Sequence, residues 1–284
     1  MPTQYHLRGA DSASQRISRR VIAEQHLALT ETFHSPWHFP QATKVTHVAP
    51  EDDFVGEVFL RCSAKEVIQN CTDKVRKLAR EAYGPDVPLP EVILQGHLDT
   101  AFPYIPSHLE YIIGELLRNS FQANVERGPG NCRPIHVLIC EASQHVLIRV
   151  SDQGGGVERD VLPYLWSFSK GPRKDRRLQN LQRVPRLAAT LQELQLPQSS
   201  ESKQSQNQGS GQNRYDGSLS SLTGRQSDIR LGIGLPMSRI YAEYWAGSLE
   251  LHSLEGYGVD AFLQISKLGN RNEVLSTRAS MDAV

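Results

Sequence analysis

The order of apolar and polar residues along the chain predicts alternating helices and strands. In several long stretches apolar residues recur every three to four positions, the spacing of an amphipathic helix, whereas strict alternation is typical of a half-buried strand. Long helices beside antiparallel strands favour a layered α/β sandwich with a mixed, mainly antiparallel sheet. We expect helices over 14–33, 63–83, from 107 onward and 235–246, and strands at 92–94, 135–142, 145–152, 248–253 and 259–266.

Capping signals predict where two of the helices begin. Ser63 is followed three residues later by Glu66, and Ser107 by Glu110. Each pair fits a capping box, in which the serine side chain accepts a hydrogen bond from the first turn of the helix. We expect the stretch 96–106, which precedes the second of these helices, to be a loop.

The composition changes abruptly between about residue 170 and residue 229. This stretch is rich in Gln, Ser, Asn and Gly, and it includes "PQSSESKQSQNQGSGQN". Such a composition buries too little apolar surface to offset the entropy lost on ordering, which predicts a disordered insertion. Long insertions inside a domain are often functional lids.

Bulk composition argues against several classes of protein. The 284 residues carry a formal net charge of +0, so no excess of positive charge attracts nucleic acid or an anionic membrane. No apolar run approaches the ~20 residues of a membrane-spanning helix. The 4 cysteines lack CxxC spacing and the density of a disulfide scaffold, which favours reduced thiols. We expect no nucleic-acid partner and no membrane insertion.

A polar strip follows one side of the helix that begins near residue 107. Glu115, Asn119 and Gln122 fall within one turn-aligned strip, because each residue turns the helix by roughly 100°. The strip borders the apolar face, where a polar group is half-buried. A carboxylate in that position is costly unless it has a partner or a chemical task.

Two glycine-rich segments follow predicted elements. Asp152 ends a strand and precedes Gly154 to Gly156, where the missing β-carbons let a flat ligand or a neighbouring helix approach the backbone. A flexible turn is an equally good interpretation of these glycines. Gly232 and Gly234 precede a helix, whose free N–H groups and positive dipole end form an anion site. Each segment alone is weak evidence for a binding site.

Together these segments resemble the motifs of the GHKL ATPase superfamily. "ELLRNSFQA" looks like the N box, "DQGGG" the G1 box, and "GIGLP" with "EGYG" the G2 and later glycine boxes. Within the superfamily, "SRRVIAEQHLAL", "FPYIPSHLEYIIGELLRN" and "GLPMSRIYAEYWAGSLELHSLEGYGVDAFLQISKL" are similar to the mitochondrial 2-oxo acid dehydrogenase kinases, which are the pyruvate dehydrogenase kinases and the branched-chain 2-oxo acid dehydrogenase kinase. The likeness covers nearly all of the chain except the insertion and the extremities.

The resemblance implies ATP and Mg²⁺ as cofactors, with K⁺ as a further candidate ion. Asn119 would give its carboxamide oxygen to Mg²⁺, which prefers oxygen ligands and bridges the ATP phosphates. Glu115 would act on the acceptor serine hydroxyl as general base, or orient and polarise it. Asp152 would accept a hydrogen bond from the exocyclic amine of adenine.

The family's glycine boxes and lid imply the remaining nucleotide contacts. Two glycines of the G1 box would let the backbone lie against the purine, and the G2 loop would wrap the phosphates together with the lid. The implied nucleotide-binding residues are Asn119, Asp152, Gly154, Gly156, Ser169, Gly232, Gly234 and Leu235.

The resemblance also implies the domain organisation. Residues 1–88 would be the remnant of a truncated N-terminal helical bundle, which in the family docks the lipoyl domain of the complex. Residues 89–268 would form a Bergerat-type (GHKL) ATP-binding domain with the lid insertion at about 170–229, and 269–284 a C-terminal tail.

The implied function is phosphate transfer from ATP to a serine of the E1 component of a 2-oxo acid dehydrogenase complex, which inhibits it. "GHLDTAFPYIP" and "HLEYI" look closer to the branched-chain branch than to the pyruvate branch. The implied partners are E1 and the lipoyl-bearing E2 component, with a homodimer as a candidate assembly. The implied location is the mitochondrial matrix.

Departures from the family pattern keep two alternatives open. Gln122 stands where the family usually carries Arg, Arg230 where the G2 loop begins with Gly, and Val259 where Thr is common. These departures, with the incomplete bundle, allow a non-catalytic nucleotide-binding protein. A histidine kinase-like GHKL ATPase is the other alternative, in which His26 of "EQHLAL" could accept phosphate or simply pack in a helix interface.

Overall fold

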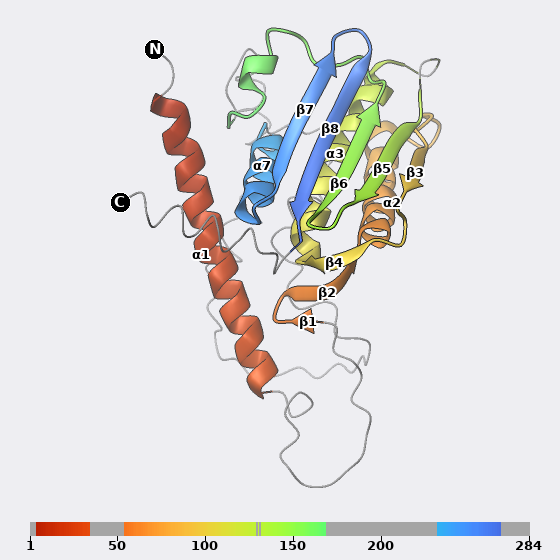
Figure 1. Ribbon diagram of the computed structural model, residues 1–284. Coiled ribbons are helices and arrows are strands. Elements are labelled where there is room, and N and C mark those ends of the chain that lie inside the picture. Colours follow the sequence, from red (N-terminus) through yellow and green to blue (C-terminus); the bar gives the residue numbers. More distant parts are fainter. Residues whose placement is uncertain (1–3, 35–53, 129, 131, 169–231, 268–284) are drawn as a thin grey trace, which may run out of the picture.

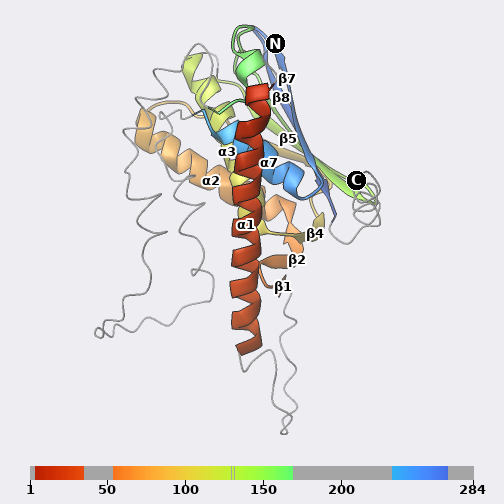
Figure 2. The same cartoon turned by 90° about the vertical axis from the view of Figure 1, so that its left-hand side faces the viewer.

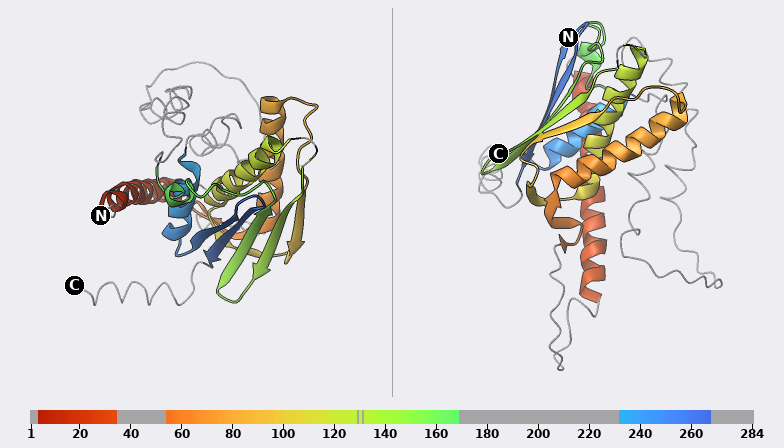
Figure 3. Two further views of the ribbon diagram at one scale, coloured as in Figure 1. Left: turned by 90° about the horizontal axis from the view of Figure 1, so that it is seen from above. Right: turned by 90° about the vertical axis from the view of Figure 1, so that its right-hand side faces the viewer.

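The computed structural model describes residues 4–34, 54–128, 130, 132–168 and 232–267. In this part of the chain a five-stranded sheet is covered on one face by helices (Figure 1). The views from above and from the right-hand side show the helices gathered on that one face (Figure 3). The expected layered α/β sandwich is confirmed.

The five-stranded sheet has the order β3-β5-β6-β8-β7. Strand β3 runs parallel to β5, and the other neighbours pair antiparallel. Alternate residues of β6 are buried, which places one side of the sheet against the helices. The mixed, mainly antiparallel sheet expected from the sequence is therefore confirmed. Its strands are β3 (Val92–Gly96), β5 (Ile135–Glu141), β6 (His145–Asp152), β7 (Ser248–Leu254) and β8 (Gly258–Ser266).

A second sheet, of three strands, was not expected. It has the order β1-β2-β4 and consists of β1 (Phe54–Val55), β2 (Val58–Ser63) and β4 (Ala101–Tyr104). Because β4 lies within 96–106, the prediction of a loop there is wrong for these four residues. Pro103 breaks the strand pattern in the sequence, but β4 is an edge strand, where a missing N–H is tolerated.

The central helix of the covering layer is α3 (Pro106–Glu126). It lies between α2 (Ala64–Tyr83) and α7 (Gly234–Tyr244) and contacts β6 of the sheet (Figure 1). Because neighbours cover it on several sides, α3 buries most of its residues rather than a single stripe. Leu109, Ile113 and Leu117 of its predicted apolar face have no exposed surface. The helix with the polar strip is thus the core of the domain.

The two predicted capping boxes have different outcomes. Ser63 caps α2 as expected, since its hydroxyl accepts a hydrogen bond from the Glu66 N–H at 3.4 Å. The box at Ser107 is wrong: α3 begins one residue earlier, at Pro106, and no side chain caps it. Glu110 instead pairs with Lys74 of α2, with 2.8 Å between its Oε2 and the lysine Nζ. A tertiary ion pair thus takes the place of the local cap.

Helix α1 (Gln4–His34) is longer than the predicted helix 14–33 and packs along α7 (Figure 2). Ile17, Val21 and Ala28, which recur at the spacing of one helix face, are buried. His26 is exposed rather than packed in a helix interface. This arrangement places α1 on the outer side of the helix that follows the second glycine-rich segment.

Several predictions concern residues outside those that the structure describes. These are the disordered insertion at about 170–229, the contact of Ser169 and the tail 269–284. The boundary at residue 88 also stays a prediction. Among the described helices, none combines the length and the apolar character needed to cross a membrane.

Candidate nucleotide-binding site

Glu115 lies under the start of α7. Its side chain is 1% exposed, and its Oε1 lies 3.8 Å from Nε of Arg118, which is also buried. Gly234, the first residue of α7, sits against this carboxylate so closely that a β-carbon there would overlap it. The polar strip and the second glycine-rich segment, 119 residues apart from Glu115 to Gly234 (234 minus 115), therefore meet in space.

Asn119 lies one turn further along α3 and is the exposed member of the strip. Its side chain makes no hydrogen bond to any residue that the structure describes. Gln122, the third member, is buried and donates to Glu126 at 3.3 Å. The strip thus presents one uncommitted carboxamide at the surface, next to a buried carboxylate.

Asp152, at the end of β6, is held by α3. Its Oδ2 accepts a hydrogen bond from the Ser120 hydroxyl at 2.8 Å, and its Oδ1 accepts one from the Gly154 N–H at 2.8 Å. Burial raises the pKa of the Asp152 carboxyl, and these hydrogen bonds act in the opposite direction. Ser120 directly follows Asn119, so the structure brings the polar strip and the strand end together.

The first glycine-rich segment packs against two neighbours. A β-carbon at Gly154 would overlap Ala123 of α3, and one at Gly156 would overlap the backbone of Leu254. Gly156 also has a φ of 76°, which side chains disfavour. These contacts give the glycines a packing role inside the protein. Their predicted contact with a purine stays a prediction.

Arg127 fixes the same loop from the end of α3. Its guanidinium donates to the carbonyl of Gln153 at 2.6 Å and to that of Gly256 at 3.2 Å. The loop after β6 and the β7–β8 turn are thus tied to one helix end. This side chain was not expected from the sequence, because its two carbonyl partners lie 26 and 129 residues away.

The start of α7 offers backbone donors. Ile233 precedes the helix and provides no side-chain cap, so the N–H groups of Gly234 and Leu235 have no acceptor within the helix. Gly232, before them, has a φ of 69°. The side chain of Leu235 packs, partly buried, against the core, so Leu235 can contact a ligand anion only through its backbone N–H. This end of α7 can bind an anion such as a phosphate.

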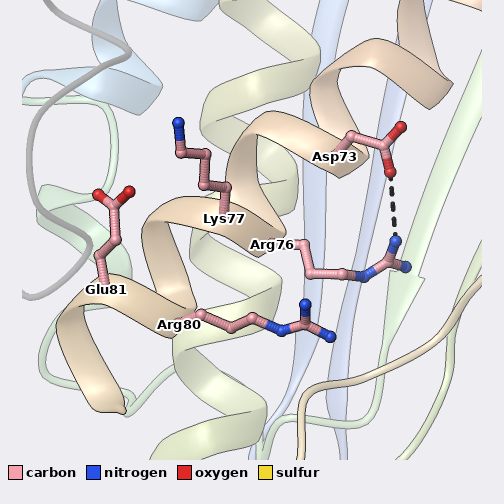
Figure 4. Close-up of a pocket in the computed structure, with 5 residues that line it drawn as sticks. All are labelled: Asp73, Arg76, Lys77, Arg80 and Glu81. Carbon is pink, nitrogen blue, oxygen red and sulfur yellow. Dashed lines mark hydrogen bonds and ion pairs between the residues drawn. The ribbon is translucent and has the colours of Figure 1, made fainter. Parts of the chain in front are cut away.

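Two hollows of the described surface lie away from this site. One, on the face of α2, is lined by charged side chains, and Arg76 pairs there with Asp73 at 3.2 Å (Figure 4). Another lies on the sheet strands, away from α3. The candidate site is therefore described by the side chains and backbone groups that converge there.

Comparison with known proteins finds relatives of this chain among the mitochondrial pyruvate dehydrogenase kinases. A scan against protein-family models found no match. A curated relative, pyruvate dehydrogenase (acetyl-transferring) kinase 2, mitochondrial, of Saccharomyces cerevisiae, is 33% identical over 289 aligned residues, which cover 92% of this chain and 56% of the relative. The chain is a homologue of the pyruvate dehydrogenase kinases. The predicted resemblance is confirmed.

Other pyruvate dehydrogenase kinases extend the likeness to plants and animals. The mitochondrial kinase of Arabidopsis thaliana is 30% identical over 267 residues, covering 92% of this chain and 57% of the relative. Isozyme 4 of Homo sapiens is 25% identical over 268 residues, covering 90% and 50%. The chain therefore spans about half the length of the curated relatives it matches. All three relatives are named as mitochondrial proteins, in agreement with the expected location.

Proposed function

We propose that this chain is an ATP-dependent protein kinase that transfers the γ-phosphate of ATP to a serine of a 2-oxo acid dehydrogenase E1 component in the mitochondrial matrix. One observation carries the proposal: Asn119, Glu115, Asp152 and the start of α7 converge around the surface of α3. Phosphoryl transfer needs mainly positioning and charge neutralisation. The side chains would position the nucleotide, and Mg²⁺ held at Asn119 together with the N–H groups at the start of α7 would offset the charge of the phosphates.

Asn119 fits the role of the magnesium ligand. Its carboxamide is exposed and uncommitted among the described residues, and Mg²⁺ usually takes few protein ligands because it keeps waters and phosphate oxygens. When bound, the ion would neutralise charge on the phosphates. The N–H groups of Gly234 and Leu235 would bind the phosphate oxygens from the opposite side.

Asp152 fits the role of the adenine acceptor. A buried carboxylate with a fixed orientation accepts a hydrogen bond from an exocyclic amine, whereas a carbonyl at the same place on guanine offers no proton. Asp152 would thus select ATP over GTP. Gly154 brings the backbone close to this carboxylate, and Gly154 and Gly156 would border the purine.

Glu115 fits the role of the group that acts on the serine hydroxyl. It lies one turn from Asn119 and against Gly234 at the start of α7, and burial removes competing water. As general base it would accept the hydroxyl proton at a carboxylate oxygen. Arg118 keeps a positive charge 3.8 Å from this carboxylate.

The E1 substrate can be pyruvate dehydrogenase or the branched-chain enzyme. The names of the three relatives favour pyruvate dehydrogenase, whereas the motifs "GHLDTAFPYIP" and "HLEYI" favour the branched-chain enzyme. Docking on a lipoyl-bearing E2 component, a homodimer and K⁺ binding belong to the same proposal and rest on the family resemblance alone.

An assay with labelled ATP and both E1 components tests the proposal. We expect Mg²⁺-dependent, acid-stable label on an E1 serine for the wild-type chain and almost none for Glu115→Gln. Label that acid removes would indicate phosphohistidine and the histidine kinase alternative. ATP binding without transfer to either E1 would indicate a non-catalytic nucleotide-binding protein.

A further inference from the structure

The Ser120 hydroxyl donates its hydrogen bond to a residue outside its own helix. A serine inside a helix commonly bonds the carbonyl four residues earlier, or points to solvent. Ser120 is 4% exposed and instead donates across the helix–sheet interface to Asp152, at 2.8 Å. A buried hydroxyl that bonds a buried carboxylate 32 residues away is a specific tertiary contact.

Three donors together hold the Asp152 carboxylate. Oδ1 is bonded by the Gly154 N–H and Oδ2 by the Ser120 hydroxyl, and the backbone of Val259 is the third hydrogen-bond partner. Two of the three are backbone groups of the flanking segments, so a substitution cannot remove them. Ser120 is the side-chain donor of this set, and it fixes the rotation of the carboxylate.

The backbone of Ser120 is itself anchored. The Asn124 side chain donates to the Ser120 carbonyl at 3.0 Å and accepts from the Arg133 N–H at 3.1 Å, and Asn124 has no exposed surface. The two hydrogen bonds of Asn124 fix the backbone of α3 at Ser120. The hydroxyl is therefore preorganised toward Asp152.

We propose that Ser120 is a positioning residue for purine recognition, which orients the Asp152 carboxylate so that its free lone pairs meet the exocyclic amine of adenine. This inference rests on the proposed nucleotide site and adds a residue to it. Without the Ser120 hydroxyl, the Asp152 carboxylate can rotate so that Oδ2 no longer faces the adenine amine. The preference for adenine over guanine then falls.

The charges and hydrogen bonds around Asp152 also give Ser120 a role in keeping the carboxyl ionised. Burial and the neighbouring Asp260 raise the pKa of the Asp152 carboxyl, whereas the Ser120 hydrogen bond lowers it. The Arg127 guanidinium is committed to the carbonyls of Gln153 and Gly256. Removing the hydroxyl thus favours the protonated carboxyl, so ATP binding is lost on acidification at a higher pH than in the wild type.

The test measures Mg-ATP and Mg-GTP affinities of the full chain by calorimetry. We expect Ser120→Ala to bind ATP about tenfold more weakly, with a much smaller change for GTP, because a hydrogen bond to a charged acceptor is lost. Ser120→Thr keeps the hydroxyl and should restore the ATP preference. Thr72→Val is the matched control: it removes a buried hydroxyl whose bond stays within α2, to the Ile68 carbonyl at 2.8 Å.

The outcomes separate this inference from the proposed function. A wild-type chain that binds neither nucleotide overturns both. A wild-type chain that prefers ATP, with Ser120→Ala showing the same preference and the same pH dependence, overturns the role of Ser120 alone. Should Ser120→Ala fail to fold, loss of the ATP preference in a folded Ser120→Thr would overturn it equally.

Discussion

The carboxylate of Glu115 occupies the space that a side chain at position 234 would need. Glu115 belongs to the middle of α3, whereas Gly234 is the first residue of α7. The close approach places the first residue of α7 against the carboxylate that we propose acts on the substrate hydroxyl. It also makes the glycine a structural requirement of the site, independent of its φ.

Gly234→Ala should therefore displace Glu115 or the start of α7. We expect a loss of about 1–3 kcal/mol in the free energy of unfolding, as for other overpacked positions, together with loss of phosphate transfer. Urea unfolding and the E1 assay measure the two effects. Gly130→Ala is the control, because a β-carbon there meets no atom within 4 Å. Equal stability of the two variants would contradict the packing seen at Gly234.

Asn119→Ala and Asn124→Ala separate binding from stability on one helix. Asn119 is exposed and uncommitted, so its loss should leave the unfolding curve unchanged and abolish the Mg²⁺ dependence of ATP binding. The buried Asn124 side chain bonds the Ser120 carbonyl and the Arg133 N–H. Its replacement removes both hydrogen bonds and should cost about 1–3 kcal/mol. Unchanged Mg²⁺ dependence in Asn119→Ala would rule out its role as a metal ligand.

Glu115→Gln keeps the shape of the side chain and removes its charge and basicity. We expect kcat to fall by about 10²–10⁴-fold, the range of general base catalysis, with the Kd for Mg-ATP changed little. Single-turnover transfer to E1 and calorimetry provide the two values. A variant that retains most of its rate would show that Glu115 serves only as the buried partner of Arg118.

His108 should make the fold sensitive to acid. It is buried, accepts a hydrogen bond from the Trp245 indole N–H at 2.9 Å, and burial lowers its pKa to about 3, with a smaller effect of Arg20. A pKa below that of the unfolded chain, 6.5, means that the unfolded state binds the proton first. Stability from neutral His108 is therefore present above pH 6.5 and is lost as pH falls toward 3.

The expected loss from this group is about 2 kcal/mol between pH 6.5 and pH 5, since one pKa unit corresponds to about 1.4 kcal/mol. His108→Gln should flatten this part of the profile of unfolding free energy against pH. His252→Gln, at an exposed position on β7, should leave it unchanged. Identical slopes for the wild type and His108→Gln would show that His108 is not the group responsible.

Periodicity predicted the helices and strands whose pattern is visible in their own residues. It did not predict elements that form only by pairing with a distant part of the chain. The strands of the β5–β6 hairpin and the apolar faces of α1 and α3 agree with the structure because each depends on neighbours along the chain. Strand β4 was missed because its partner β2 lies about 40 residues away and Pro103 interrupts the pattern. The predicted capping box at Ser107 was wrong for a similar reason, because Glu110 forms an ion pair with Lys74 of α2 instead.

The sequence predicted several residues of the candidate site, but not which of them contact one another. The strip of Glu115, Asn119 and Gln122 was expected to be half-buried throughout, yet Glu115 is covered by α7 and Asn119 is exposed. Ser120 was not among the predicted site residues, because nothing in its local sequence points to Asp152. Its role follows only from the register between α3 and β6.

Calorimetry of Mg-ATP binding to the wild type, Asp152→Ala and Asn119→Ala tests most directly whether α3 and the end of β6 hold one nucleotide. The account predicts one ATP bound per wild-type chain. It also predicts that Asp152→Ala loses the preference for ATP over GTP, and that binding to Asn119→Ala is the same with Mg²⁺ and with EDTA. Both variants binding Mg-ATP as the wild type does, with unchanged selectivity and unchanged metal dependence, would contradict it.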